Sequence, residues 1–243
     1  MTSRTIDVEV WIDTGVPSED FMDKVFEDVL EEDGTLYASH IMVNHLEDLS
    51  YSQRLRSLVS IFNYKKRLKS LRGRMFYKTI HEDTDKAIED ALKTYTKTEK
   101  VSCRRGCSHC CYMFVDVFPH EAVALANKVK KGQYYNKEEF ELQKDKTTPQ
   151  EYVDDPRPCI FLKEGECSVY ADRPMTCRKY FVVNDSPDLC EIIPGESNQV
   201  QNPLMYEAEV IYSAVAQVAE SHDPMGMAHM VDRALKGEFK DGK

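Results

Sequence analysis

The chain has 243 residues, 42% of them hydrophobic and 30% charged, which is an ordinary balance for a folded globular protein and excludes intrinsic disorder. Its formal net charge of −10 argues against general binding of nucleic acid, and no apolar run approaches the roughly 18 residues that a membrane span needs. The first residues lack the pattern of a signal peptide, so we expect a cytoplasmic protein whose thiols stay reduced.

The N-terminal part of the chain predicts one strand followed by helices. Apolar residues alternate with polar ones at the start, which predicts a strand through Ile6, Val8, Val10 and Ile12. Helical spacing then predicts a helix from Pro17 to Gly34. A longer helical region is expected from about residue 46 to 98, with a break near Gly73. We expect residues 1–100 to form one unit of unassigned role.

The remaining part, residues 101–243, is expected to form a cysteine-cluster domain with C-terminal helices. Pro119 suits the first position of a helix that Gly132 ends, and residues 136–146 predict a weaker helix. The proline-bearing stretch 147–158 is interpreted as a connector. The last predicted helix, LMYEAEVIYSAVAQVAE, ends near Ser221.

Between these helices the sequence predicts a small β element beside the cysteines. The β-prone runs CIFL and CSVY flank KEGE, a pattern typical of a hairpin with Gly165 in its turn. The segment RPMTCRKYF then predicts a short turn or helix that carries Cys177. The predicted fold class is therefore mainly α with a small β element (α+β), arranged around a metal-stabilised, cysteine-rich centre.

The cysteines form two segments with the spacing of metal ligands. The first segment is C-x3-C-x2-C with one further cysteine attached, and the second follows about fifty residues later: Cys103, Cys107, Cys110 and Cys111, then Cys159, Cys167 and Cys177. In a reducing compartment, clustered thiols bind metal more often than they form disulfides. One tetrahedral zinc ion or one cubane iron–sulfur cluster takes four ligands.

The crowding of the first segment favours an iron–sulfur cluster over zinc. Structural zinc sites usually use two spaced pairs of ligands, whereas ferredoxin-type sequences take three ligands from one loop and one from a distance. We therefore predict a [4Fe-4S] cluster, with zinc as the alternative or as a second metal. Because the side chains of adjacent residues diverge, we expect Cys110 or Cys111 to hold the cluster and the other to face a second metal or stay free.

The first segment also fits two alternative structures. Positions 103, 107, 110 and 111 match one stripe of an α-helix, in which free cysteines would pack as small hydrophobic residues. The C-x3-C-x2-C spacing is also that of the radical-SAM loop, whose open iron binds S-adenosylmethionine. However, no strand–helix alternation follows Cys111, and no glycine-rich nucleotide loop occurs.

Taken together, the motifs CRRGCSHCC and PCIFLKEGECSVYADRPMTCRKY resemble the YkgJ-like cysteine-cluster family of zinc- or iron-chelating domains. The resemblance covers about residues 101–183, and its matching residues are Cys103, Cys107, Cys110, Cys111, Cys159, Cys167, Tyr170, Arg173, Pro174, Cys177 and Arg178. Flagellin lysine N-methylases are similar, and for them an iron–sulfur cluster is the implied cofactor. Cys190 lies outside the pattern and is not expected to be a ligand.

Basic residues and histidines surround the cysteines. Positive charge beside a thiol favours the thiolate that metals need, and five such residues are close in sequence: Arg104, Arg105, Arg173, Arg178 and Lys179. His109 and His120 are alternative ligands, although a lone histidine is more often a structural residue. The Met- and His-rich stretch 222–230 is interpreted as core rather than as a metal site.

Residues 54–78 contain nine basic residues and no acidic one. Their apolar residues recur at helical spacing, which predicts a basic amphipathic helix. Because the rest of the chain is acidic, we expect this helix to dock on the protein itself rather than on nucleic acid.

Two hypotheses of function follow from the sequence. The leading one is a cytoplasmic metalloprotein with an iron–sulfur cluster, with redox or methyl-transfer activity as the options and a protein partner or other substrate that stays unidentified. The alternative is a zinc-stabilised interaction module without catalysis, which would use the basic helix 54–78 to bind a partner. An open cavity beside the metal would distinguish the first from the second.

Overall fold

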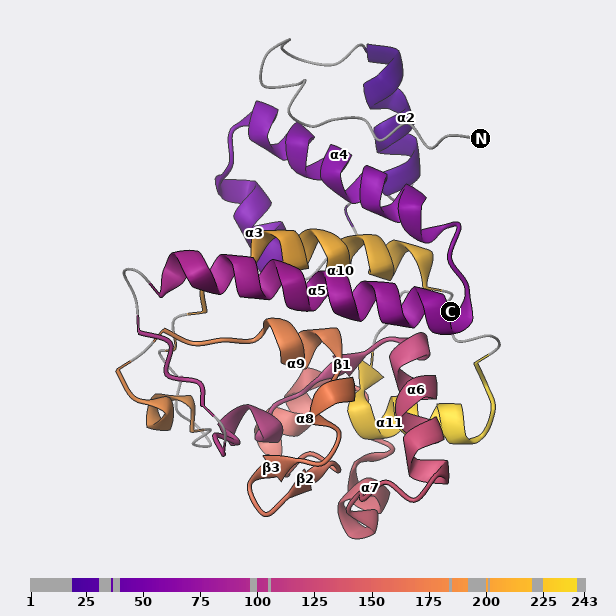
Figure 1. Ribbon diagram of the computed structural model, residues 1–243, viewed down its shortest axis with the longest axis vertical. Coiled ribbons are helices and arrows are strands. Elements are labelled where there is room, and N and C mark those ends of the chain that lie inside the picture. The colour runs from indigo at the N-terminus through magenta and orange to yellow at the C-terminus, as the bar shows by residue number, and fades with distance from the viewer. Residues whose placement is uncertain are drawn as a thin grey trace.

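The computed structural model describes residues 19–30, 36, 40–96, 100–104, 106–183, 185–191, 200, 202–219 and 225–239. The strand predicted at residues 6–12 lies outside these ranges. The described part of the chain is mainly helical, as the sequence predicts, and has two small two-stranded sheets, of which the sequence predicts one (Figure 1). None of its helices is both long enough and apolar enough to cross a lipid bilayer.

The N-terminal helices form one half of the molecule and enclose a helix from the C-terminal part. These helices are α2 (Glu19–Val29), α3 (His40–Asp48), α4 (Tyr51–Leu68) and α5 (Gly73–Tyr95), and α10 (Tyr206–Val218) packs against α3, α4 and α5. Figure 1 shows α10 directly beside α5, with α4 and α2 above them. Because neighbours cover it on several sides, α10 is buried continuously from Ala208 to Ala216.

The apolar side chains of α2, α4, α5 and α10 form one core, which explains the helical spacing in the sequence. Its most buried members include Val25, Val59, Ile61, Ile80 and Val215, all of them fully excluded from solvent. The predicted break in the long helical region is present, since α4 ends at Leu68 and α5 begins at Gly73, which has a positive φ of 49°. The proposed boundary near residue 100 stays a prediction.

Residues 54–78 do not form the one helix predicted for them, since they are divided between α4 and α5, but part of this basic segment docks on the protein itself. Lys65 of α4 and Lys69, the residue that follows the last turn of α4, both contact Asp28 on α2, with Lys69 Nζ 2.6 Å from Asp28 Oδ1. Arg67 Nη1 lies 2.6 Å from Asp83 Oδ2 on α5. These three contacts connect neighbouring helices, and they agree with the expected intramolecular docking of residues 54–78.

The other half of the molecule is built around α6 and α11. It contains β1 (Asp116–Val117), α6 (Pro119–Lys130), α7 (Lys137–Gln143), α8 (Pro149–Asp154), β4 (Met225–Gly226) and α11 (Met227–Leu235). α6 packs against α11, and β1 pairs antiparallel with β4, so that Asp116 lies opposite Gly226. Glycine is required at 226, because an added Cβ would lie 2.9 Å from the hydroxyl oxygen of Tyr152.

A hairpin and short helices complete this half. The predicted hairpin is confirmed as β2 (Leu162–Lys163) and β3 (Glu166–Cys167), and its turn residues Glu164 and Gly165 have positive φ values of 51° and 81°. It is followed by 3-10 helix η2 (Tyr170–Asp172), α9 (Met175–Lys179) and 3-10 helix η3 (Pro187–Cys190).

Two predictions from the C-terminal part were wrong. The stretch 147–158, interpreted as a connector, contains helix α8, because Pro149 begins it and Glu151 caps it by accepting the amides of Thr147 and Thr148 at 2.9 and 2.8 Å. The helix α10 is not the last one, since β4 and α11 follow it within the Met-rich stretch. The predicted helices at 119–132 and 136–146 are present as α6 and α7.

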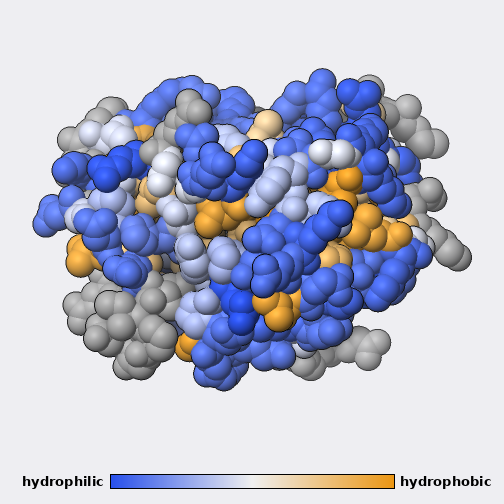
Figure 2. All heavy atoms as spheres, turned by 90° about the horizontal axis from the view of Figure 1, so that it is seen from below, coloured by the Kyte–Doolittle hydropathy of each residue, from blue (hydrophilic) through white to orange (hydrophobic). Residues whose placement is uncertain are grey.

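The face below the cysteine half is largely hydrophilic, as Figure 2 shows, and its hydrophobic residues form separate patches. Across the described residues, the large hydrophobic side chains that are most exposed come from different elements: Met75, Tyr112, Tyr134, Leu142, Val153, Tyr170 and Leu189.

Candidate metal centre

The two cysteine segments lie side by side and are joined through their backbones. The amide of Cys159 donates a hydrogen bond of 2.6 Å to the carbonyl oxygen of Cys111. At the other end of both segments, the amide of Ser102 donates to the carbonyl oxygen of Val182 at 3.1 Å. The folded chain therefore brings together thiols that are about fifty residues apart in the sequence.

Six thiols line a single cavity of about 490 Å³. Three of them come from each segment: Cys107, Cys110 and Cys111, and Cys159, Cys167 and Cys177. The thioethers of Met113 and Met227 line the same cavity, and Met227 Sδ lies 3.5 Å from Cys159 Sγ. Neither Cys103 nor Cys190 is among the lining residues; Cys103 is half-buried, and Cys190 is buried in η3.

All eight cysteines are free thiols. As they stand, no three His, Cys, Asp or Glu side chains within the described ranges lie close enough together to hold one metal ion. A single zinc ion with Zn–S distances of about 2.3 Å would require its sulfur atoms to approach to about 4 Å of one another.

The first segment is a turn followed by a 3-10 helix, and not the continuous α-helix of the core alternative. Gly106 has a φ of 82°, a left-handed conformation that allows the amide of Cys107 to turn back onto the carbonyl oxygen of Arg104 at 3.0 Å. Cys110 and Cys111 then lie in 3-10 helix η1 (His109–Tyr112). The thiols consequently do not follow a single helical stripe.

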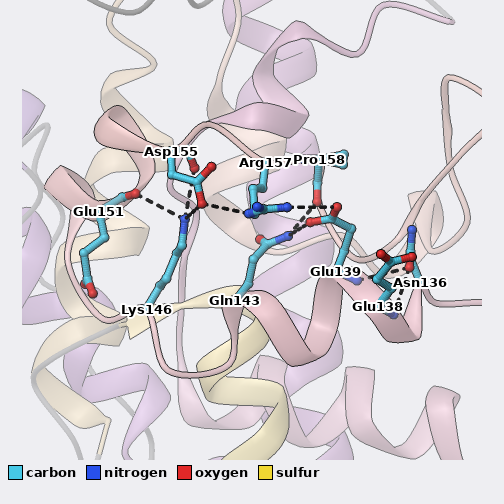
Figure 3. Close-up of polar contacts among 9 residues, drawn as sticks. All are labelled: Asn136, Glu138, Glu139, Gln143, Lys146, Glu151, Asp155, Arg157 and Pro158. Carbon is cyan, nitrogen blue, oxygen red and sulfur yellow. Dashed lines mark hydrogen bonds and ion pairs between the residues drawn. The ribbon is translucent and has the colours of Figure 1, made fainter.

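A polar network on α7 holds the chain that leads into Cys159 (Figure 3). Gln143, which is almost fully buried, donates through Nε2 to the carbonyl oxygen of Pro158 and to Glu139, both at 2.9 Å. Arg157 connects Glu139 with Asp155, and Asp155 also accepts a bond from Lys146 at 2.8 Å, as the same view shows. This network fixes the backbone immediately before the thiol of Cys159.

Helix α9, which carries Cys177, is anchored to three other elements by its side chains. Thr176 donates to Asp116 of β1 at 2.6 Å, and Asp116 also accepts a bond from the hydroxyl of Tyr212 on α10. Lys179 is paired with the buried carboxylate of Glu209 on α10 at 2.8 Å.

Arg178 is the third anchor of α9 and is buried. It pairs with Asp85 of α5 at 2.6 Å, and its remaining donors bond the carbonyl oxygens of Ala171 and Arg173. Arg178, the second arginine of the RPxxCR motif, therefore stabilises the loop before Cys177 and connects it to α5, and it does not line the cavity.

Burial and mutual contacts shift the pKa values of the thiols in opposite directions. Burial raises the pKa of Cys159 to about 12 and that of Cys177 well above its ordinary value. A hydrogen bond with Cys111 lowers the pKa of Cys110 to about 7, while the pKa of Cys111 is raised by the same contact. Buried neutral thiols need a strong cation to become thiolates, so metal binding at this cavity would release protons.

Arg173 supplies positive charge at the cavity. Its guanidinium lies 4.1 Å from the ring centre of Tyr170 and helps to lower the pKa of Cys110. Its Nε atom is buried and has no hydrogen-bond partner within the described part of the chain. A buried N–H donor in a cavity that six thiols and two thioethers line fits a thiolate-bound metal or cluster.

The two histidines considered as ligands lie elsewhere. His109 is 3.8 Å from Asp188, and His120 packs among the rings of Phe76 and Phe118. Burial lowers the pKa of His120 to about 4. Neither lines the cavity.

The cavity and its thiols define a cysteine-rich centre. Residues 102–201 match the family model of the CxxCxxCC domain, described as "Putative zinc- or iron-chelating domain". The matched stretch contains all eight cysteines, which confirms the resemblance noted in the sequence. No curated protein and no solved structure matches the chain.

Proposed function

We propose that the cavity binds an iron–sulfur cluster of the [4Fe-4S] type. The observation that carries this proposal is the convergence of six thiols from both segments on one cavity of about 490 Å³. A single four-coordinate ion would use only four of them and little of the space, whereas a polynuclear cluster uses thiolates that are farther apart. When bound, a cluster of this type would supply one-electron redox chemistry or, with an open iron, activation of a substrate.

The proposed ligands are the seven cysteines of the two segments: Cys103, Cys107, Cys110, Cys111, Cys159, Cys167 and Cys177. The six that line the cavity exceed the four that one cluster requires. The surplus supports a second metal, zinc or iron, or thiols that stay free. Cys190 is left out because it lies outside the cysteine pattern of the two segments, to which Cys103 belongs.

Arg173 would compensate the negative charge of a thiolate-bound cluster. Its unpartnered Nε is a donor of the kind that hydrogen bonds to cluster or thiolate sulfur, and such bonds raise the reduction potential. The guanidinium of Arg173 also contacts the ring of Tyr170. Because Tyr170 is 63% exposed, this pair lies at the solvent side of the centre.

The cavity favours an active centre over a purely structural one. Structural zinc sites are closed by their four ligands, whereas a catalytic or redox centre keeps a position open. The walls beside the thiols contain apolar and aromatic residues with room for a small molecule, among them Met113, Phe114, Phe161 and Tyr180. Redox or methyl-transfer chemistry in a reducing, cytoplasmic environment is the proposal that these features support.

The alternative, a zinc-stabilised interaction module, draws on the same family description, which includes zinc. This alternative also requires a basic helix that is available to a partner. That requirement receives less support, because Lys65, Arg67 and Lys69 already contact carboxylates of α2 and α5.

Anaerobic purification followed by metal and sulfide analysis tests the proposal. We expect a brown protein that absorbs near ~400 nm and contains iron with acid-labile sulfide. A colourless anaerobic preparation with stoichiometric zinc would overturn the cluster and favour the interaction module. Aerobic samples are unsuitable for this test, because zinc replaces a lost cluster.

A further inference from the structure

Glu121 is a buried carboxylate that connects three elements around the candidate metal centre. Its side chain is 1% exposed. Within α6 it accepts the amide of Phe118 at 3.1 Å, and from α9 it accepts the amide of Met175 at 2.7 Å. His81 of α5 completes the set, with its Nε2 atom 3.5 Å from Glu121 Oε1.

The contact with Met175 is the one that reaches the centre. Met175 is the first residue of α9, its side chain is fully buried, and Cys177 follows two residues later. Pro174, Thr176 and Cys177 all line the cavity. A displacement of the amide of Met175 would therefore move the cavity wall and the thiol of Cys177 together.

Glu121 is charged at neutral pH despite its burial. Burial alone would raise its pKa, but the contacts with His81, His120 and the amide of Met175 together lower it. Hydrogen bonds to a charged carboxylate are shorter and stronger than those between neutral groups. The start of α9 is thus held by a charge-assisted bond inside the protein.

We propose that Glu121 is a positioning residue of the metal centre, which fixes the thiol of Cys177 by holding the start of α9 against α5 and α6. This inference rests on the proposed role of Cys177 as a ligand. Residues that orient metal ligands from outside the coordination sphere affect metal affinity nearly as much as the ligands themselves.

The chain offers a matched control in Glu151. Both glutamates occupy the third position of a helix that begins with proline, and both accept amides at that helix's own start. Glu151 accepts the amides of Thr147 and Thr148, and it is half-buried, whereas Glu121 is fully enclosed. Of the two, only Glu121 also contacts α5 and α9, so a difference between the two variants reports these contacts and not the helix cap that both share.

Cobalt(II) titration of the reduced, metal-free protein tests the proposal, because thiolate-bound cobalt is coloured and its affinity can be measured by competition with a chelator. We expect E121A to bind cobalt about 10–100-fold more weakly than wild type. E121Q retains an oxygen that accepts the amide of Met175, so its affinity should lie between the two. E151A should stay within about twofold of wild type, since its glutamate caps only α8.

Circular dichroism of each metal-free variant separates positioning from folding. If E121A does not fold, E121Q carries the test, with an expected loss of about tenfold. Wild-type affinity in a folded E121Q would overturn the proposal. So would equal losses in E121A and E151A.

The midpoint potential of cluster-loaded protein provides a readout that a merely structural role would not move. Removing a buried negative charge should make the potential of E121Q more positive, whereas E151Q should keep that of wild type. If wild type binds cobalt through thiolates but assembles no cluster, the proposed function fails and the cobalt comparison still decides the role of Glu121. If wild type shows no thiolate–cobalt band, Cys177 is not a ligand and both proposals fail.

Discussion

The amide of Cys159 donates to the carbonyl oxygen of Cys111, so that the last thiol of the first segment and the first thiol of the second are joined by a backbone bond of 2.6 Å. The polar network around Pro158 supports this bond from α7. Contacts of this kind limit how far Cys111 and Cys159 can separate, which lowers the conformational entropy that metal binding has to offset.

The first prediction compares Cys177→Ser with Cys190→Ser. Cys177 lines the cavity, so its replacement should lower the bound metal and the melting temperature of the metal-loaded protein. Cys190 is buried outside the cavity, so its replacement should keep the metal and cost about 1–2 kcal/mol through one buried hydroxyl. Metal analysis and thermal melts provide the measurements. Equal loss of metal from both variants would make Cys190 a ligand.

The second prediction concerns the anchor of α9 on α5. Arg178→Lys should destabilise the metal-free protein by about 2–4 kcal/mol, because lysine cannot reproduce its planar set of bonds and leaves buried carbonyl oxygens without a donor. Asp85→Asn should cost less than about 1 kcal/mol, since the Asp85 side chain is 56% exposed and its pairing is screened by water. Urea unfolding measures both. A larger loss in Asp85→Asn would show that the ion pair, and not the carbonyl bonds, holds Arg178.

Local elements were predictable where a single residue type fixes them. Pro119 begins α6, and Gly165 supplies the left-handed turn residue of the β2–β3 hairpin. Helix α8 was missed although its sequence contains the signal, because Thr148 and Glu151 form a capping box around Pro149. Proline occurs in connectors as well as at the first position of a helix, so the prolines of that stretch do not distinguish the two.

Long-range contacts could not be predicted from the sequence. Helix α11 directly follows β4, and β4 pairs with β1, which lies more than a hundred residues earlier in the chain. No local pattern in the sequence of β4 indicates that β1 is its partner. The same holds for the centre. Spacing identifies ligand-like cysteines, but only the fold shows that Cys103 lies outside the cavity wall and that Glu121 bonds the amide of Met175.

The third prediction is a pH dependence that comes from His120. Burial lowers the pKa of this histidine to about 4, below the value of about 6.5 in an unfolded chain. The unfolded state therefore binds a proton first, and stability should fall as pH decreases from about 6.5 to 4. At pH 5 the loss from this one group should be about 2 kcal/mol relative to pH 7.

Urea unfolding of metal-free wild type and His120→Leu at pH 7 and pH 5 measures this contribution. Leucine cannot titrate and leaves no unpartnered ring nitrogen in the core. Between pH 7 and pH 5, the free energy of unfolding of the variant should therefore fall by about 2 kcal/mol less than that of wild type. Identical pH slopes in the two proteins would show that His120 is protonated in the folded state.

The last prediction separates self-docking of the basic helix from binding to nucleic acid. Lys65 of α4 contacts Asp28 and its side chain is only 12% exposed, so Lys65→Glu places a second carboxylate against Asp28 and should cost about 1–3 kcal/mol. Lys66, the neighbouring residue, is exposed and makes no ion pair with the described residues, so Lys66→Glu should change stability by less than about 0.5 kcal/mol. Both proteins should show negligible retention on DNA or RNA. If the helix instead binds phosphate backbones, wild type should be retained with a log–log salt slope of about −0.9 per contact, and Lys66→Glu should weaken retention without a change in melting temperature. That outcome would reject self-docking as the role of these cations and favour the interaction module over the redox centre.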